Sequence, residues 1–208
     1  MDKQANWWLT SIELGIMYKP VAKAACTSFM EYFLNEASIK TDKLSDNDIH
    51  NIVVNKIPLI SDDCYLEVSR AFKLKTFSFV RNTYKRFISC YKNKVIGRNS
   101  AYGEQIYNTT KKTTLDEFIN YTESFIDMAT CDRHLRLQSV VIPDKIHFVG
   151  RVEYMEKDDL SRLSKLIKHD INISHKNKSN VNIKLTNKQK NILYTIYKND
   201  FDRFGYTK

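Results

Sequence analysis

The chain has 208 residues, about the length of one domain, and its aromatic content of 12% excludes an intrinsically disordered chain, which is poor in aromatic residues. No run of about 18 apolar residues is present, so no membrane span is predicted, and the first residues lack the basic region and apolar run of a signal peptide. The formal net charge of +9 favours an anionic partner: nucleic acid, a phosphate-bearing cofactor, an acidic polysaccharide or an anionic lipid.

The four cysteines are widely spaced, at positions 26, 64, 90 and 131, and no two of them form a C-x-x-C pair. This spacing argues against a zinc site. Because nothing signals secretion, we expect reduced thiols and a cytoplasmic location.

The first predicted unit is a strand, a loop and a helix. Apolar residues alternate over 12–18, as in a strand, and Pro20 ends this pattern. A short loop, VAKAACT, leads to Ser28, and Glu31 follows three residues later. This spacing is that of a capping box, so a helix is expected to start at Ser28.

The second unit follows a polar stretch. Residues 40–61 indicate irregular structure or a short helix, and residues 62–72 indicate a helix. The segment KTFSFVRNTYKRFISCYKNK then predicts a strand over 74–80 and a helix over about 83–94. On this helix Ser89 shares the polar side with Lys85, Arg86 and Lys92.

The remaining elements continue the alternation. We expect a surface excursion over 95–113, a helix over 113–125 that Thr114 caps, strands at SVVI (139–142) and KIHFVGRVE (145–153), and a helix over 156–170. A last helix starts at Thr186, where Gln189 completes a capping box. Strands that alternate with helices predict an α/β fold with a largely parallel sheet, in a single domain over residues 1–208.

Two strand-to-helix junctions are candidates for anion binding. In a parallel sheet, ligands bind beyond the carboxyl ends of the strands, where helix N-termini present N–H groups. The first junction, residues 23–28, has small residues, two hydroxyls and Lys23, but it is not a Walker A motif. The second has Arg81, a planar donor suited to phosphate, and Ser89 eight residues later. The alternative is that both are ordinary connections and that the basic helix face is solvated.

At these junctions the sequence resembles the carbohydrate sulfotransferases of the Golgi type, the group (sulfotransferase family 2) with the chondroitin, dermatan, HNK-1 and heparan sulfate 2-O enzymes. Their first motif reads roughly P-K-x-A-S/C-T-S, and AKAACTS (22–28) matches it with Ala22 in place of the proline. Their second reads F-V-R-D/E-P-Y/F-E-R-L/F-x-S-x-Y-x-N-K, and FVRNTYKRFISCYKNK (79–94) matches most positions. Asn82 and Thr83 replace the acid and the proline, and either can still cap the helix.

The resemblance continues in the same order to Tyr206. DRHLRLQ (132–138) is similar to D-x-H-W-x-P-Q, with Leu135 and Leu137 in place of Trp and Pro. HFVGRVEYMEKDDLSRL (147–163) is similar to D-F-V-G-R-x-E-x-L-x-x-D-x-x-x-L, and YKNDFDRFGY (197–206) to Y-x-x-D-F-x-x-F-G-Y. Several motifs in a shared order are far more specific than any one of them.

The resemblance implies a fold related to the P-loop nucleotide kinases, with a parallel sheet flanked by helices. It also implies sulfuryl transfer from 3′-phosphoadenosine 5′-phosphosulfate (PAPS) to a carbohydrate hydroxyl, without a metal. The residues implied at the donor are Lys23, Ala24, Ala25, Cys26, Thr27 and Ser28 around the 5′-phosphosulfate, Arg81 and Ser89 at the 3′-phosphate, and Arg151 near the nucleotide.

Two histidines are candidates for the base that removes the acceptor proton. His50 is the only histidine between the two junctions, where related 2-O enzymes carry one, so the resemblance favours it as the base. His134 matches the histidine of D-x-H-W and is assigned a supporting or substrate role. Lys23 would stabilise the charge that grows on the bridging oxygen. Without the resemblance, a structural or surface role would be the expectation for both histidines.

Other functions remain open from the sequence. The charge would also suit a nucleic-acid-binding protein, and Leu135 leaves open a family member that binds PAPS or a glycan without catalysis. The missing Walker A motif argues against a P-loop kinase. With no membrane anchor visible, the resemblance fits a cytoplasmic bacterial enzyme that acts on an oligosaccharide, a polysaccharide or a glycolipid, or else an excised catalytic domain.

Overall fold

The computed structural model describes residues 6–97, 99–125, 127–173 and 183–208. The chain divides into two compact units, and each is described by itself. The first comprises Met1–Val80 and Val141–Lys176, and the second comprises Arg81–Val140 and Asn177–Lys208. The division into two compact units does not test the expectation of a single domain over residues 1–208, which stays a prediction.

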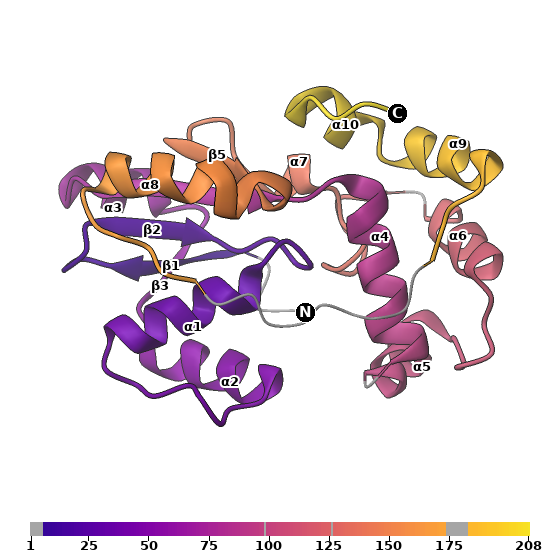
Figure 1. The fold of residues 1–208 in the computed structure, drawn as a ribbon, viewed down its shortest axis with the longest axis horizontal. Coiled ribbons are helices and arrows are strands. Elements are labelled where there is room, and N and C mark those ends of the chain that lie inside the picture. The colour runs from indigo at the N-terminus through magenta and orange to yellow at the C-terminus, as the bar shows by residue number, and fades with distance from the viewer. Residues whose placement is uncertain (1–5, 98, 126, 174–182) are drawn as a thin grey trace. The chain divides into compact units, whose positions relative to one another are not determined.

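The first unit is built on a five-stranded sheet (Figure 1). Its strands are β1 (Trp7–Ser11), β2 (Ile16–Lys19), β3 (Leu59–Ser61), β4 (Lys75–Val80) and β5 (Phe148–Arg151), in the order β3-β1-β2-β4-β5. β2, β4 and β5 are parallel, whereas β1 is antiparallel to both β2 and β3. The predicted α/β class is confirmed. The prediction of a largely parallel sheet was wrong for β1 and β3, because β1 pairs antiparallel with both of its neighbours.

A hairpin turn replaces the first half of the strand predicted over 12–18. Residues 12–15 form this turn between β1 and β2, and Ser11 pairs with Ile16. Gly15 has φ +66°, a left-handed conformation that glycine adopts without steric cost, and its N–H donates to the carbonyl of Ile12 at 3.1 Å. Ile12 is consequently 56% exposed, so its alternation with Leu14 was coincidental.

Helices cover both faces of this sheet. They are α1 (Cys26–Glu36), α2 (Asp46–Lys56), α3 (Tyr65–Ala71) and α8 (Leu160–Ile167), and short helical turns at Val152–Tyr154 and Met155–Asp159 lead into α8. One core cluster joins the strands to three helices through Tyr18, Phe29, Phe33, Val53, Phe77, Phe79 and Leu163. On the other face Trp8 stacks on Tyr65 of α3, with ring centroids 4.6 Å apart.

The second unit is helical. It contains α4 (Thr83–Tyr91), which continues as a π-helical turn over Lys92–Ile96, and α5 (Ser100–Tyr107), α6 (Leu115–Glu123), α7 (Gln138–Val141), α9 (Asn187–Ile196) and α10 (Lys198–Phe204). Its core is largely aromatic and includes Phe87, Tyr91, Tyr107, Phe118, Tyr197 and Phe201.

Several local predictions are confirmed. The strand at 74–80 and the helix from 83 are β4 and α4, and the helices at 113–125 and 156–170 are α6 and α8. Thr114 caps α6 and Thr186 caps α9, each in a reciprocal capping box. These signals depend on residues three apart, so the local sequence is enough to specify them.

Residues 40–61 contain a helix, which was one of the two expectations for this stretch: α2, capped by Ser45 and Asp48. The short strand β3 in the same stretch was not predicted. Two other expectations were wrong because packing decides them. Residues 95–113 contain α5, and Tyr107 is buried in the core rather than on the surface. Most of SVVI belongs to α7 and is not a strand.

Candidate active site

Three neighbouring parallel strands end at one edge of the sheet. β2 pairs with β4 so that Lys19 partners Ser78, and β4 pairs with β5 so that Val80 partners Arg151. Residues 23–28 follow the end of β2, and Arg81 is the residue that follows β4. This is the edge at which parallel α/β sheets bind ligands.

The loop after β2 turns sharply into α1. Lys23 has φ 66° and Ala25 has φ 61°, both in the left-handed region that residues with a side chain seldom adopt. Such residues cluster at ligand sites, where the surrounding structure holds them. The two left-handed residues therefore make this loop a candidate for ligand binding.

The N-terminus of α1 suits an anion. α1 begins at Cys26, its first turn contains no acidic residue, and in the described part of the chain no side chain caps it. The N–H groups of a first turn and the helix dipole both favour negative charge. The capping box predicted at Ser28 and Glu31 was wrong: both residues lie inside α1 and are buried, because the left-handed Ala25 starts the helix earlier.

The loop after β4 is organised differently. The side chain of Asn82 accepts a hydrogen bond from the N–H of Lys85 at 3.2 Å, so α4 carries its own cap, as predicted. An anion here would depend on side chains rather than on helix N–H groups. Arg81 and Ser89 are both half-buried, at the start of this segment and on α4.

The basic face expected around Ser89 is smaller than predicted. Lys85 is exposed, but Arg86 is only 2% exposed, and its guanidinium donates to the carbonyl of Arg133 at 3.2 Å. Farther along, Lys94 is buried, with its ammonium 4.0 Å from the ring centroid of Tyr102. Helical spacing could not show this, because helices of the same unit cover the face.

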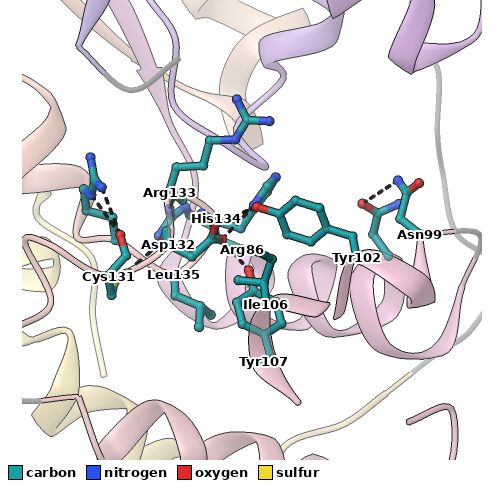
Figure 2. A network of polar contacts seen from close by, with 12 residues as sticks. Arg86, Asn99, Tyr102, Ile106, Tyr107, Cys131, Asp132, Arg133, His134 and Leu135 are labelled. Atoms are coloured by element: carbon teal, nitrogen blue, oxygen red, sulfur yellow. Dashed lines mark hydrogen bonds and ion pairs between the residues drawn. The ribbon is translucent and has the colours of Figure 1, made fainter. Parts of the chain in front are cut away.

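A buried network surrounds His134 (Figure 2). Nδ1 of His134 lies 2.8 Å from Oδ1 of Asp132, and the hydroxyl of Tyr102 donates to Oδ2 at 2.6 Å. The hydroxyl of Tyr107 and the N–H of His134 also donate to this carboxylate. Although burial raises the pKa of Asp132, the hydrogen bonds from His134, Tyr102 and Tyr107 outweigh it and hold that pKa well below its usual range.

The network sets the protonation state of His134. Burial lowers the pKa of His134 to about 3, against the opposing effect of the Asp132 carboxylate. The imidazole is therefore neutral near pH 7. An ionised carboxylate only accepts hydrogen bonds, so the ring proton sits on Nδ1 and the lone pair on Nε2.

A family model described as "Sulfotransferase family" matches residues 9–207. The chain belongs to the sulfotransferase family. The searches of curated proteins and of solved structures each found no match. Membership assigns the chain to the transferases that move sulfuryl groups, a family that generally uses PAPS.

In this sulfotransferase, His50, the second candidate for the base, lies in the first unit. His50 is on α2, one residue after the buried Ile49, and is itself half-buried. Its unit also contains the loop of residues 23–28, whereas His134 belongs to the second unit.

Arg151 is the last residue of β5. Its N–H donates to Oδ2 of Asp159 at 2.6 Å, and its guanidinium lies 6.0 Å from the ring centroid of Tyr154. The preceding Gly150 packs against Phe79, since a Cβ at this glycine would come within 2.4 Å of the phenyl ring. The glycine of the F-V-G-R motif thus lets β5 lie beside β4.

Sequence reasoning missed two buried residues of this sulfotransferase. Gln138 hydrogen-bonds the backbone of Arg81, and Asp200 hydrogen-bonds Gln138. Gln138 lies in DRHLRLQ and Asp200 in YKNDFDRFGY, two segments that resemble family motifs. This position within the motifs was the sequence feature that could have pointed to these two residues. Their partners are 57 and 62 residues away in sequence, so no local pattern shows the contacts.

The structure describes residues 6–97, 99–125, 127–173 and 183–208. No group of three or more His, Cys, Asp or Glu side chains in them could hold a metal ion. No helix among them is long and apolar enough to span a bilayer.

Proposed function

We propose that this sulfotransferase uses PAPS as donor and a carbohydrate hydroxyl as acceptor, in a direct in-line transfer. The observation that carries the proposal is the loop of residues 23–28. Two left-handed residues turn it into an α1 N-terminus that lacks an acidic residue in its first turn. Backbone N–H groups in such a turn form a concavity for phosphate-like anions, and Lys23 adds a positive charge.

PAPS would supply a sulfuryl group, which forms a new S–O bond to the acceptor oxygen as the bond to the bridging oxygen breaks and adenosine 3′,5′-bisphosphate leaves. Lys23 and the first turn of α1 would stabilise the negative charge on the bridging oxygen. Arg81 and Ser89 would hold the 3′-phosphate, and Arg151 would lie near the nucleotide. Cys26 would pack in the loop, because direct transfer requires no nucleophilic thiol.

A base must take the proton of the acceptor hydroxyl. A general base works best when its pKa is close to the working pH. With a pKa of about 3, His134 is a weak proton acceptor but a good neutral hydrogen-bond acceptor at Nε2. We therefore propose His50 as the base and His134 as a residue that orients the acceptor.

Turnover of variants separates the two histidines. We expect His50→Ala to lower kcat by about 10²–10⁴-fold, the usual contribution of general base catalysis. His134→Asn should raise KM for the acceptor more than it lowers kcat. Normal turnover of purified His50→Ala would show that His50 is not the base.

The burial of Leu135 weighs against the alternative of binding without catalysis. This alternative rested on Leu135 in place of the family's tryptophan, but Leu135 is fully buried in the core of its unit. The side chain at this position packs inside the unit, and its exchange for leucine removes no exposed group.

The decisive experiment is a transfer assay with radiolabelled PAPS against a panel of acidic and neutral glycans, combined with a thermal shift by adenosine 3′,5′-bisphosphate. We expect label on at least one glycan and a raised Tm with the bisphosphate. No transfer together with no thermal shift would overturn the proposed function.

A further inference from the structure

The backbone of Arg81 is held by one buried side chain. The N–H of Arg81 donates to Oε1 of Gln138 at 2.9 Å, and Nε2 of Gln138 donates to the carbonyl of Arg81 at 2.9 Å. The amide of Gln138 thus satisfies both polar groups of the Arg81 backbone, as a neighbouring strand would. These two hydrogen bonds lie between the end of β4 at Val80 and Asn82, the N-cap of α4.

Asp200 orients that side chain. Its Oδ2 accepts the N–H of Gln138 at 3.0 Å and lies 3.4 Å from Nε2, and its Oδ1 accepts the N–H of Ser139 at 2.8 Å. Gln138 and Asp200 are both fully buried. Asp200 belongs to α10, so the connection runs from α10 through the start of α7 to Arg81.

The amide of Gln138 has one favourable orientation. Its NH₂ group faces two acceptors, the carbonyl of Arg81 and the carboxylate of Asp200, while its oxygen faces the N–H of Arg81. A flipped amide would set NH₂ against N–H and oxygen against carboxylate, and buried polar groups without partners are unfavourable. Asp200 therefore sets the geometry at Arg81.

We infer that Gln138 and Asp200 are positioning residues that fix the backbone of Arg81 so that its guanidinium binds the 3′-phosphate of the donor. This inference rests on the proposed function. An arginine fork recognises phosphate only when its direction is right, and misplacement by about 1 Å is costly. A backbone clamped on both sides reduces the entropy that Arg81 would otherwise lose on binding.

The test compares two ligands that differ only in the 3′-phosphate. Calorimetry gives Kd for adenosine 3′,5′-bisphosphate and for adenosine 5′-monophosphate with wild type, Gln138→Met, Gln138→Glu, Asp200→Asn and Arg81→Ala. We expect wild type to prefer the bisphosphate, and Gln138→Met and Asp200→Asn to reduce this preference by about 10-fold. Kd for the monophosphate should stay within about twofold.

Two controls separate positioning from general stability. Thr122→Val removes another buried hydrogen bond of the same unit, from the Thr122 hydroxyl to the carbonyl of Phe118, and should leave the preference unchanged. In the Arg81→Ala background, Gln138→Met should cause no further loss. Gln138→Glu keeps an acceptor for the Arg81 N–H but sets a carboxyl oxygen against Asp200, so it should lose at least as much of the preference as Gln138→Met; Asp200→Asn serves if Gln138→Met does not fold.

The outcomes are distinct. If wild type prefers the bisphosphate and folded Gln138 and Asp200 variants keep that preference, the positioning role is overturned and the proposed function stands. Equal weakening for both ligands likewise overturns it, because that is what a structural role produces. If wild type shows no preference, the 3′-phosphate site itself fails, and the inference fails with it.

Discussion

Lys23 combines a left-handed backbone with the charge that the proposed chemistry needs. Among the described residues, its φ of 66° is one of six positive values at non-glycine positions, and Ala25 two positions later supplies another. A lysine can reach such a conformation only where neighbouring structure holds it, at a cost of order 1–3 kcal/mol. Residues in such conformations cluster at functional sites, so Lys23 is a candidate for a catalytic role.

Replacing Lys23 should damage turnover more than folding. We expect Lys23→Ala to lower kcat by about 10²–10³-fold, the range for removing one donor at a developing oxyanion. Removing the lysine side chain should change Tm little. The measurement is steady-state transfer with a thermal melt, and Lys23→Arg, which keeps the charge, is the control. Unchanged kcat in Lys23→Ala would contradict the assigned role.

His134 should make stability depend on pH. Its pKa is lowered from 6.5 to about 3 on folding, so below pH 6.5 the unfolded state binds a proton that the folded state refuses. Stability is therefore complete above pH 6.5 and falls as the pH drops toward 3, by at most about 1.4 kcal/mol per pH unit. The low pKa of Asp132 acts in the same direction at more acidic pH.

The pH effect can be isolated by a difference between variants. Urea unfolding at pH 7.5 and pH 5.5 should show a larger loss for wild type than for His134→Asn, by about 1 kcal/mol. His147, whose pKa burial also lowers, is present in both proteins and cancels. Equal losses would mean that His134 is protonated in the folded state.

At the scale of elements, β5 depends on a residue without a side chain. Gly150 partners Phe79 across the parallel pair β4–β5, and Phe79 is fully buried. Arg151 follows Gly150, so the packing of this pair determines where Arg151 leaves the sheet.

A methyl group at this position should be costly. We expect Gly150→Ala to destabilise the protein by about 1–3 kcal/mol, because Phe79 cannot move without displacing the core. Denaturant unfolding measures the loss. Phe79→Leu in the same chain makes room, so the double variant should recover part of it, whereas strictly additive losses would contradict the packing argument.

At the scale of the whole molecule, the formal net charge is +9, and among the described residues three buried cations are matched by three buried acidic residues, Glu31, Asp159 and Asp200, so burial leaves the positive excess at the surface. Arg86 and Lys94 are buried in the second unit, and Lys19 is buried in the first, where its ammonium lies 2.5 Å from Asp62. These cations belong to the interior of each unit. Because the chain belongs to the sulfotransferase family, we expect a small anionic ligand, rather than nucleic acid, to be the functional partner.

Salt dependence tests this expectation. A protein that neutralises six or more DNA phosphates loses about 10³-fold or more in affinity between about 50 and 200 mM salt. We expect only such weak, salt-sensitive binding to duplex DNA, and less than a tenfold change for adenosine 3′,5′-bisphosphate. Tight, sequence-specific DNA binding at 200 mM salt would favour the nucleic-acid alternative.

Elements defined by contacts near in sequence were predictable. The capping boxes at Thr114 and Thr186, the strand before Arg81 and the helix after it follow from residues within one or two turns. The capping box predicted at Ser28 has the same spacing, but this prediction was wrong. Ala25 is the N-cap of α1, so the helix begins at Cys26 and Ser28 lies inside it.

The sequence by itself determined the family motifs, their order and the residues expected at the donor, because these depend on residue type and spacing. Only the tertiary structure decided that β1 and β3 run antiparallel, that Arg86 is buried and that Gln138 and Asp200 hold the backbone of Arg81. The physical reason is distance along the chain. Pairings across 57 and 62 residues gain their energy only when the whole unit has closed, and no local pattern records them.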